Sequence, residues 1–563
     1  MGIIIDNSFK NICITKPRGF GKTSIAAMLV TYYSEGFDSK EIFDTLKVSK
    51  GLSSSDEKEK QLEVMQYHKY QGKYHTIYFN FSHGVDEFET LNDYLASLNQ
   101  IIKEDLQLIY PNCDLLKNYG KEIHWNLERL FDVMDIKFIF IIDEWDYIIN
   151  NNKFTPKERN NYLSFLKYLL KDSGYVAFTF MTGIIPIVNE SYQDSLNFFS
   201  EYSVWKDEKY YRYFGFTEHE VQELCKKNNT LKYEDIKNWY NGYKSSNGDI
   251  IYNPHSVIQA IQKKSIDHYW IPTEQSDELV RVINFNISGI KEEMIELIEG
   301  KEISIKLNYF GVKYLLESEN NGIENDDDKR KKKLYSWMVS FGYLTYHNGK
   351  ISIPNKEVLK KYVRVLGERD DLRYYYDLIE NSQTLLKLTM NINFKGISKM
   401  LEKACTMKSN KNIDYSDLKR IIYFSYFNAL ITYDIEEGDK IDLKEKEKAN
   451  YNADYIFYPK DKSNEKVIII KIIINGSIEE IAKQVNDNNY NSIIKNKGYR
   501  SGIIFIGINY HNDDRNQKYV GILEKNSQGN LYLGGSSHQC MQTKRKNDID
   551  TGSEFKKIKK ESD

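Results

Sequence analysis

Residues 16–24 read KPRGFGKTS and lie between an apolar stretch, NICIT (residues 11–15), and an amphipathic run, SIAAMLVTYY (residues 24–33). This order predicts a strand, a glycine-containing loop and a helix, which is the setting of a phosphate-binding loop. Backbone N–H groups of the loop and of the helix N-terminus would surround the phosphates. The residues expected to bind a nucleotide here are Gly19, Gly21, Lys22, Thr23 and Ser24.

Two side chains of this stretch have specific expected roles. The Lys22 ammonium would reach the β- and γ-phosphates, and the Thr23 hydroxyl would hold Mg²⁺. Lys16 stands where the G-x-x-x-x-G-K-[ST] pattern has its first glycine. A basic loop without any nucleotide is therefore the alternative interpretation of this stretch taken alone.

A second motif favours the nucleotide. Residues 137–143, KFIFIID, form an apolar run that ends in Asp143 and is followed by Glu144. A buried parallel strand delivers such acids to the crevice where nucleotides bind. Asp143 would act on Mg²⁺ and Glu144 would polarise the attacking water. Thr182, at the end of the expected strand 175–183, would either face the γ-phosphate or cap its own turn.

Composition excludes several other classes of protein. Of the 563 residues 41% are hydrophobic, and the net charge is −3, so nothing global demands nucleic acid or an anionic membrane. The five cysteines lie far apart without a C-x-x-C pair, which excludes a disulfide framework or a cysteine zinc site. No apolar run approaches the ~20 residues of a membrane span, and MGIIIDNSF does not resemble a secretory signal.

The middle of the chain is predicted to be mostly helical. Further strands are expected at 75–82 and 175–183, a long helical stretch at 87–131, and a capping box at Thr217 and Glu220. The stretch 236–257 predicts a helix end, an Asn-Gly turn and a Tyr-Asn-Pro stop. Residues 334–358 read as helix, strand, tight turn, strand and helix, like a winged-helix unit. The charged run 324–333 is interpreted as a solvated loop and helix start, with phosphate contacts by its Lys/Arg half as the alternative.

The C-terminal part is predicted to contain a β-hairpin (452–476), a helix and a strand (501–509). Beyond it the chain is polar, and a disordered tail is expected. Basic clusters at 544–545 and 556–560 have the spacing of a bipartite nuclear import signal, whereas a merely solubilising tail would leave the protein cytoplasmic.

The ordered motifs CITKPRGFGKTSIAAML, IIDEWD, FMTG, YFGFTEHEV, WYNGY and IYNPHSV resemble the AAA-ATPase-like family, and FGYLTYHNGKISIPNKEV resembles the region that follows them. The resemblance covers about residues 5–360. It implies an ASCE-type ATPase core in a regulatory or assembly switch, and it accepts a basic residue at Lys16. The family usually has a further segment upstream of the first strand, so the short N-terminus either removes part of the adenine pocket or reflects a truncated gene model.

The family's usual partner is a PD-(D/E)XK nuclease-like domain, which residues 415–525 resemble. Asp454 matches the first metal-binding acid, and Gln484 and Tyr490 match downstream helix positions. Lys471 and Ile473, however, replace the glutamate and lysine of the E-x-K motif. The resemblance therefore implies a nuclease-like fold without its metal site.

The sequence as a whole predicts an α/β protein with a parallel-sheet P-loop core, a helical and winged-helix-like middle region, a small restriction-endonuclease-like domain and a disordered tail. The expected bounds are 1–270, 271–414, 415–525 and 526–563. ATP and Mg²⁺ are the expected cofactors, and DNA and a second copy of the chain are candidate partners, with Arg212 as a candidate trans-acting arginine. The alternatives are an active Mg²⁺-dependent DNA nuclease completed by Glu445, Glu447 or Glu465, and a non-enzymatic interaction protein.

Overall fold

The computed structural model describes residues 10–51, 56–111, 122–187, 196–270, 277–307, 311–312, 326–408, 413–438, 453–476, 490–510, 520–525 and 531–534. The chain divides into two compact units, residues 1–362 and 363–563. Gln484, Glu445, Glu447 and both basic clusters of the tail lie outside the described residues. Among the described helices, none has the length and apolar character to cross a membrane.

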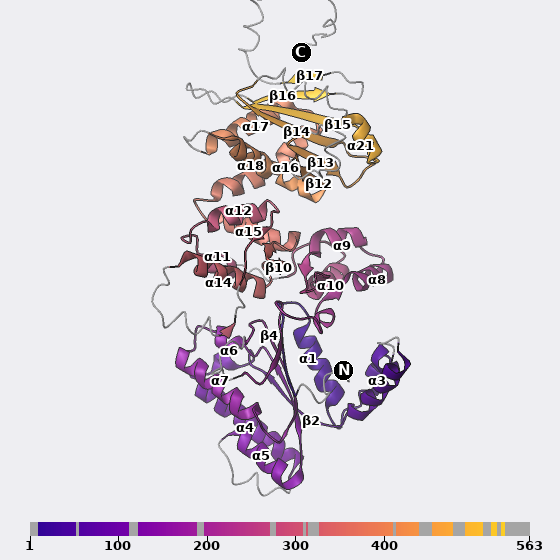
Figure 1. Ribbon diagram of the computed structural model, residues 1–563, viewed down its shortest axis with the longest axis vertical. Coiled ribbons are helices and arrows are strands. Elements are labelled where there is room, and N and C mark those ends of the chain that lie inside the picture. Colours follow the sequence, from indigo (N-terminus) through magenta and orange to yellow (C-terminus); the bar gives the residue numbers. More distant parts are fainter. Residues whose placement is uncertain are drawn as a thin grey trace, which may run out of the picture. The chain divides into compact units, whose positions relative to one another are not determined.

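The first unit is built on a parallel sheet of order β2-β3-β4-β1-β5. Its strands are β1 (Asn11–Thr15), β2 (His75–Asn80), β3 (Phe138–Asp143), β4 (Val176–Gly183) and β5 (Ser200–Tyr202). All six residues of β3 are buried, as in a strand covered on both faces. Figure 1 shows α1 (Lys22–Tyr33) on one face, and α4 (Leu91–Ile109), α5 (Ile123–Met134) and α7 (Pro156–Leu170) on the other.

Side chains on β1, α1, β3 and β4 form the core on the α1 face of this sheet. Asp143 lies on that same face, because it follows Ile139 and Ile141 at intervals of two residues and both belong to this core. The remaining elements of the core region are α2 (Lys40–Phe43), α3 (Glu57–Tyr70), α6 (Tyr147–Asn150) and the 3-10 helices η2 (Lys47–Lys50) and η3 (Val85–Glu87).

The rest of the first unit consists of short strands and helices. The elements up to α10 are η5 (Tyr211–Tyr213), β6 (Phe216–Thr217), α8 (Glu218–Asn228), α9 (Tyr233–Tyr240), β7 (Tyr243–Lys244), β8 (Ile250–Tyr252) and α10 (Pro254–Lys263). They are followed by α11 (Asp277–Val282), α12 (Ile290–Ile298), β9 (Ile303–Ser304), α14 (Asp327–Ser340), β10 (Thr345–His347), β11 (Lys350–Ser352) and α15 (Lys356–Gly367).

Several sequence-based expectations are met in this region, and one is corrected. The capping box of Thr217 and Glu220 is present at the start of α8. The helix, two strands and helix expected at 334–358 correspond to α14, β10, β11 and α15, with Asn348 and Gly349 at the turn. The Tyr-Asn-Pro stretch does not stop a helix: Asn253 caps α10 and Pro254 occupies its first turn, where a missing N–H costs nothing.

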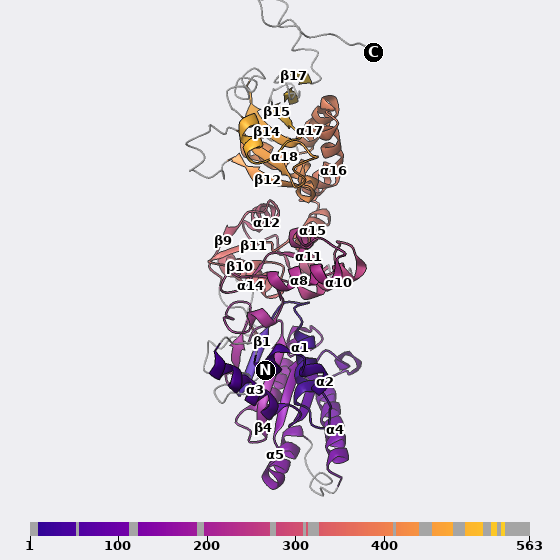
Figure 2. The same cartoon turned by 90° about the vertical axis from the view of Figure 1, so that its right-hand side faces the viewer.

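The second unit contains a sheet of order β12-β13-β14-β15-β16-β17. Helices α16–α18 are seen beside it in Figure 2, and α21 packs on the core of β13, β14 and β15. The bounds are α16 (Arg373–Met390), α17 (Phe394–Met407), α18 (Tyr415–Ser425), η7 (Phe427–Ile431), β12 (Tyr433–Glu437), β13 (Tyr455–Pro459), β14 (Val467–Ile474), α21 (Tyr490–Asn496), β15 (Ile503–Tyr510), β16 (Val520–Lys525) and β17 (Leu531–Gly534).

Two features of this unit differ from the expectation. α16 and α17 belong to it, although the predicted bounds assign residues up to 414 to the middle region. β17 pairs with β16, so ordered structure extends into the stretch 526–563 that is predicted to be a disordered tail. The predicted hairpin is present as antiparallel β13 and β14, and β15 runs parallel to β14.

Candidate nucleotide-binding site

The phosphate loop connects β1 to α1 in the predicted manner. Gly19 and Gly21 have φ angles of 81° and 82°, in the left-handed region that glycine enters without steric cost. Gly21 is the N-cap of α1, and within the described ranges of the chain no side chain caps the first turn of this helix. The N–H groups of that turn have no partner within the helix, so they form an anion-binding end.

Lys22 lies buried across the loop. Its Nζ donates to the carbonyl oxygens of Lys16 (3.1 Å) and Pro17 (3.2 Å). No carboxylate forms an ion pair with Lys22 in the described part of the chain. Two neutral acceptors hold the ammonium in place without cancelling its charge, which therefore remains available to a phosphate.

Asp143 and Glu144 follow β3 as predicted. Asp143 is fully buried, and burial raises the pKa of its carboxyl, while the Thr23 hydroxyl beside it and the charge of Lys22 oppose the rise. Its Oδ1 accepts the Glu144 N–H at 3.1 Å, and its buried Oδ2 has no hydrogen-bond partner among the described residues. Glu144 has a φ of 51°, so the chain turns sharply directly after the strand.

The structure therefore brings Thr23, Lys22 and Asp143 together from two separate segments, while Ser24 lies exposed on the first turn of α1. Thr182 is placed differently from either interpretation of it. Its buried hydroxyl donates to the Ile14 carbonyl of the neighbouring strand at 2.8 Å. Contact with a γ-phosphate would require this bond to break.

Strand β2 contributes two residues to the site that the sequence did not predict. Asn80 is aligned with Asp143 in the parallel ladder, and Tyr78 shares its face of the sheet because side chains alternate along a strand. Burial, together with the carboxylates of Asp143 and Glu144, raises the pKa of Tyr78. Asn80 Oδ1 accepts both the N–H and the hydroxyl of Ser82, so its amide N–H₂ faces the other way.

Asp146 is a third residue near the site that the sequence did not predict. Its carboxyl is buried, and burial, with a smaller contribution from Glu144, raises its pKa to about 6. Oδ2 accepts the N–H groups of Ile184 (3.0 Å) and Ile185 (2.7 Å), which follow β4. Asp146 therefore joins the segment after β3 to the segment after β4.

Lys16 has an unpredicted partner. Its Nζ lies 2.7 Å from Oδ2 of Asp207, and both side chains are almost completely buried. Burial lowers the pKa of Lys16, and Asp207 opposes that effect. The ion pair fastens the first residue of the loop to the segment that follows β5.

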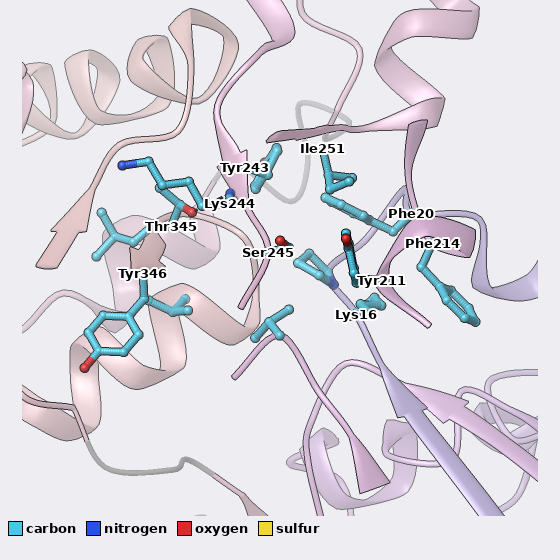
Figure 3. A pocket seen from close by; sticks show the side chains of 14 residues that line it. Lys16, Phe20, Tyr211, Phe214, Tyr243, Lys244, Ser245, Ile251, Thr345 and Tyr346 are labelled. Carbon is cyan, nitrogen blue, oxygen red and sulfur yellow. Dashed lines mark hydrogen bonds between the residues drawn. The ribbon is translucent and has the colours of Figure 1, made fainter. Parts of the chain in front are cut away.

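Arg212, the candidate trans-acting arginine, is exposed and donates to the Tyr211 hydroxyl at 2.8 Å. On its outer side, the phosphate loop also lines a small pocket of about 50 Å³ with Lys16, Pro17 and Phe20. Figure 3 shows its lining, which includes Phe20, Tyr211, Phe214 and Tyr243.

Residues 4–193 match the family model described as a predicted AAA-ATPase. The nucleotide-site residues of β1, α1, β2, β3 and β4 all lie within this match. The expected AAA-ATPase-like resemblance is thus confirmed for this part of the chain, and the match does not extend to the second unit.

A curated relative is the "Uncharacterized protein in vnfD 5'region" of Azotobacter chroococcum mcd 1, 29% identical over 152 residues. The aligned part is 26% of this chain and 29% of the relative's length. Among solved structures, the Walker-type ATPase PABY2304 of Pyrococcus abyssi has a TM-score of 0.31 at 10% identity, over 63% of this chain and 91% of that one. The Aeropyrum pernix ORC2 protein, in ADPNP–ADP complexes, has a TM-score of 0.27 at 10% identity, over 63% and 87%.

Proposed function

We propose that the first unit binds Mg-ATP at the phosphate loop and hydrolyses it. The observation that carries this proposal is the convergence of an uncapped α1 N-terminus, an unneutralised Lys22 and the Thr23–Asp143 contact at one edge of a parallel sheet. The match of residues 4–193 to a predicted AAA-ATPase family supports it.

The residues present fit a magnesium ion. The unpartnered, buried Oδ2 of Asp143 and the Thr23 hydroxyl are oxygen donors, which Mg²⁺ prefers, and nucleotide phosphates and water supply the remaining ligands in such sites. Bound there, the ion would neutralise phosphate charge. Asp143 would hold it, and Lys22 would contact the terminal phosphates.

Glu144 is the proposed general base. It follows Asp143 directly at the end of β3, and its positive φ turns the chain at that point. A carboxylate beside the terminal phosphate can take a proton from the attacking water. Lys22, the loop N–H groups and Mg²⁺ would stabilise the charge that develops on the phosphate oxygens.

Two substitutions in the full chain test these roles. Lys22→Ala removes the charge that meets the phosphates, so ATP binding measured by calorimetry should be lost. Glu144→Gln keeps the shape and removes the base, so this variant should bind ATP and turn it over at most at ~1% of the wild-type rate.

Lys40→Ala is the matched control, because Lys40 is also the first residue of a helix but lies exposed on α2. Unchanged ATP affinity in folded Lys22→Ala would contradict the binding site. Wild-type turnover by Glu144→Gln would contradict the base.

For the second unit we propose a nuclease-like module that does not cleave DNA. In support, Asp454 is surrounded by donors: its Oδ2 accepts the Ile472 N–H at 2.6 Å and lies 3.4 Å from Nζ of Lys471, and its Oδ1 accepts the Tyr415 hydroxyl. A lysine ammonium beside the carboxylate repels a divalent cation. Among the described residues no three or more His, Cys, Asp and Glu side chains form a group that could hold a metal ion.

Glu465 cannot complete the site. It lies in the hairpin turn between β13 and β14, whereas Asp454 precedes β13 and Lys471 pairs near the opposite end of the hairpin. The five residues of β13 separate the two ends by about 16 Å. Glu445 and Glu447 fall outside the described residues.

The test is incubation of the full chain with plasmid and linear DNA in Mg²⁺ and in Mn²⁺. No cleavage is expected. Metal-dependent cleavage that disappears in Asp454→Ala would contradict the proposal. The double change Lys471→Glu with Ile473→Lys is the converse experiment, since it restores the two side chains that the resemblance implies.

A further inference from the structure

The outer wall of the phosphate loop is bonded to a segment more than two hundred residues away in the sequence. The Arg18 carbonyl accepts two hydrogen bonds, from Nδ2 of Asn253 and from the indole Nε1 of Trp270, each 3.0 Å long. The next carbonyl, that of Gly19, accepts the His255 N–H at 3.2 Å. Neither Asn253 nor Trp270 lies within the residues that match the ATPase family.

These bonds fix the direction of two peptide groups. In a trans peptide the C=O and the following N–H point in opposite directions. The donors hold the Arg18 and Gly19 carbonyls toward the outer wall, and therefore the N–H groups of Gly19 and Phe20 point to the other side of the loop. A row of N–H groups on one side is what binds an anion.

The donors are themselves held in place. Oδ1 of Asn253 accepts the N–H groups of His255 (3.0 Å) and Ser256 (3.4 Å) at the start of α10, so its amide N–H₂ is directed at the loop. The backbone N–H of Trp270 donates at 2.8 Å to Oε1 of Glu357, a buried carboxylate on α15. The Trp270 ring meets Tyr343 edge-on at 5.3 Å.

Asn253 lies so close to Gly19 that a residue with a side chain would not fit at this position of the loop. A Cβ at Gly19 would lie 2.6 Å from Oδ1 and 2.8 Å from Nδ2 of Asn253. The loop, its glycine and the outer donors therefore fit together as one structure.

We propose that Asn253 and Trp270 are positioning residues for phosphate binding: they hold the loop carbonyls outward and so preset the N–H groups that receive the phosphates of the nucleotide. This inference rests on the proposed binding of ATP at the loop. It makes affinity for the phosphate chain depend on the segment from 253 to 270 and, through Glu357, on α15.

The test compares Trp270→Phe, which removes the indole N–H and keeps a ring, with Asn253→Asp, which keeps the capping oxygen and loses the donor. Trp205→Phe is the matched control, because the Trp205 indole donates at 3.2 Å to Ser340 rather than to the loop. Binding of ATP and of inorganic tripolyphosphate to the full chain is measured by calorimetry. Loss of one hydrogen bond corresponds to about tenfold in affinity.

Trp270→Phe should weaken ATP and tripolyphosphate by the same factor of about ten, and Asn253→Asp by more, since a carboxylate would face the Arg18 carbonyl. Trp205→Phe should change neither. A purely structural role would lower the melting temperature of folded Trp270→Phe and leave both affinities at the wild-type values, which would overturn the inference. Should Asn253→Asp fail to fold, Trp270→Phe still decides.

The experiment distinguishes failure of the proposed ATP binding from failure of the positioning role of Asn253 and Trp270. A wild-type chain that binds neither ATP nor tripolyphosphate overturns the proposed function and, with it, this inference. Wild-type binding that Lys22→Ala abolishes and Trp270→Phe leaves unchanged overturns this inference alone.

Discussion

The buried ion pair between Lys16 and Asp207 predicts strong energetic coupling between the phosphate loop and the segment after β5. The two charged atoms lie 2.7 Å apart, and their side chains are 7% and 1% exposed. Asp207 also accepts the N–H groups of Lys209 (3.1 Å) and Tyr210 (2.6 Å) through its other oxygen. The perturbation is a double-mutant cycle of Lys16→Met, Asp207→Asn and the two together.

The magnitude follows from the distance. At an effective dielectric of about 20 the attraction across 2.7 Å is about 6 kcal/mol, against a desolvation cost of several kcal/mol for each ion. Asp207→Asn leaves the Lys16 ammonium buried without a counter-charge, so we expect a loss of about 3–5 kcal/mol in the free energy of unfolding. Lys16→Met should cost less, because two N–H groups still meet Asp207, and the double variant should recover most of the loss.

The assay is urea unfolding of the full chain without nucleotide. The transition to be followed is the one that added Mg-ATP shifts in a separate measurement. The expected coupling energy is about 3 kcal/mol. The exposed pair Lys226–Glu223, at 2.9 Å, provides the control cycle with Lys226→Met and Glu223→Gln, for which a much smaller coupling is expected because solvent screens exposed charges. A Lys16–Asp207 coupling no larger than that of the exposed pair would refute the reasoning.

Three further predictions concern single residues of the site. Gly19→Ala should destabilise the chain by at least ~1 kcal/mol more than Gly84→Ala, because both have positive φ but only Gly19 is crowded; equal melting temperatures would contradict this. Because the pKa of Asp146 is about 6 when folded and about 4 when unfolded, the folded chain binds the extra proton between these pH values. The contribution of Asp146 to the free energy of unfolding therefore falls as the pH rises from about 4 to about 6. Asp146→Asn should remove the fall and be up to ~3 kcal/mol more stable than wild type at pH 7 without Mg²⁺, and a difference that is constant from pH 4 to 7 would count against it. Tyr78→Phe should lower kcat several-fold and leave ATP affinity within about twofold, since its hydroxyl lies beside Asp143; Tyr74→Phe, the same change one residue before β2, should lower neither.

The sequence predicts those parts of the site whose signals are local. The strand before Lys16, the helix after Gly21 and the acids after residue 142 are each set by neighbours within a few positions, and the structure has all of them. The capping box of Thr217 is of the same kind. Such features depend on periodicity and on residues that cap or break a helix, which one segment carries by itself.

The parts that could not be predicted depend on distant partners. Nothing near Lys16 indicates that Asp207 will neutralise it, and nothing near Arg18 indicates Asn253 or Trp270. Thr182 illustrates a second limit: a polar residue at a strand end is visible in the sequence, but the neighbouring strand decides which acceptor it meets. The Asn253-Pro254 pair shows a third, because the same two residues are compatible with the end and with the beginning of a helix.

The strand order also sets when the nucleotide site can form during synthesis. β1 is made first but lies between β4 and β5, so it stays without either neighbour until residues 176–202 have left the ribosome. The bonds to Arg18 then span 235 and 252 residues, and closing such long loops is entropically costly. The apolar strand β1 therefore remains without its neighbouring strands until then, and a nucleotide can bind the nascent chain with the affinity of the complete site only after Trp270 has emerged. Contacts of such high sequence separation also predict slow folding of this unit.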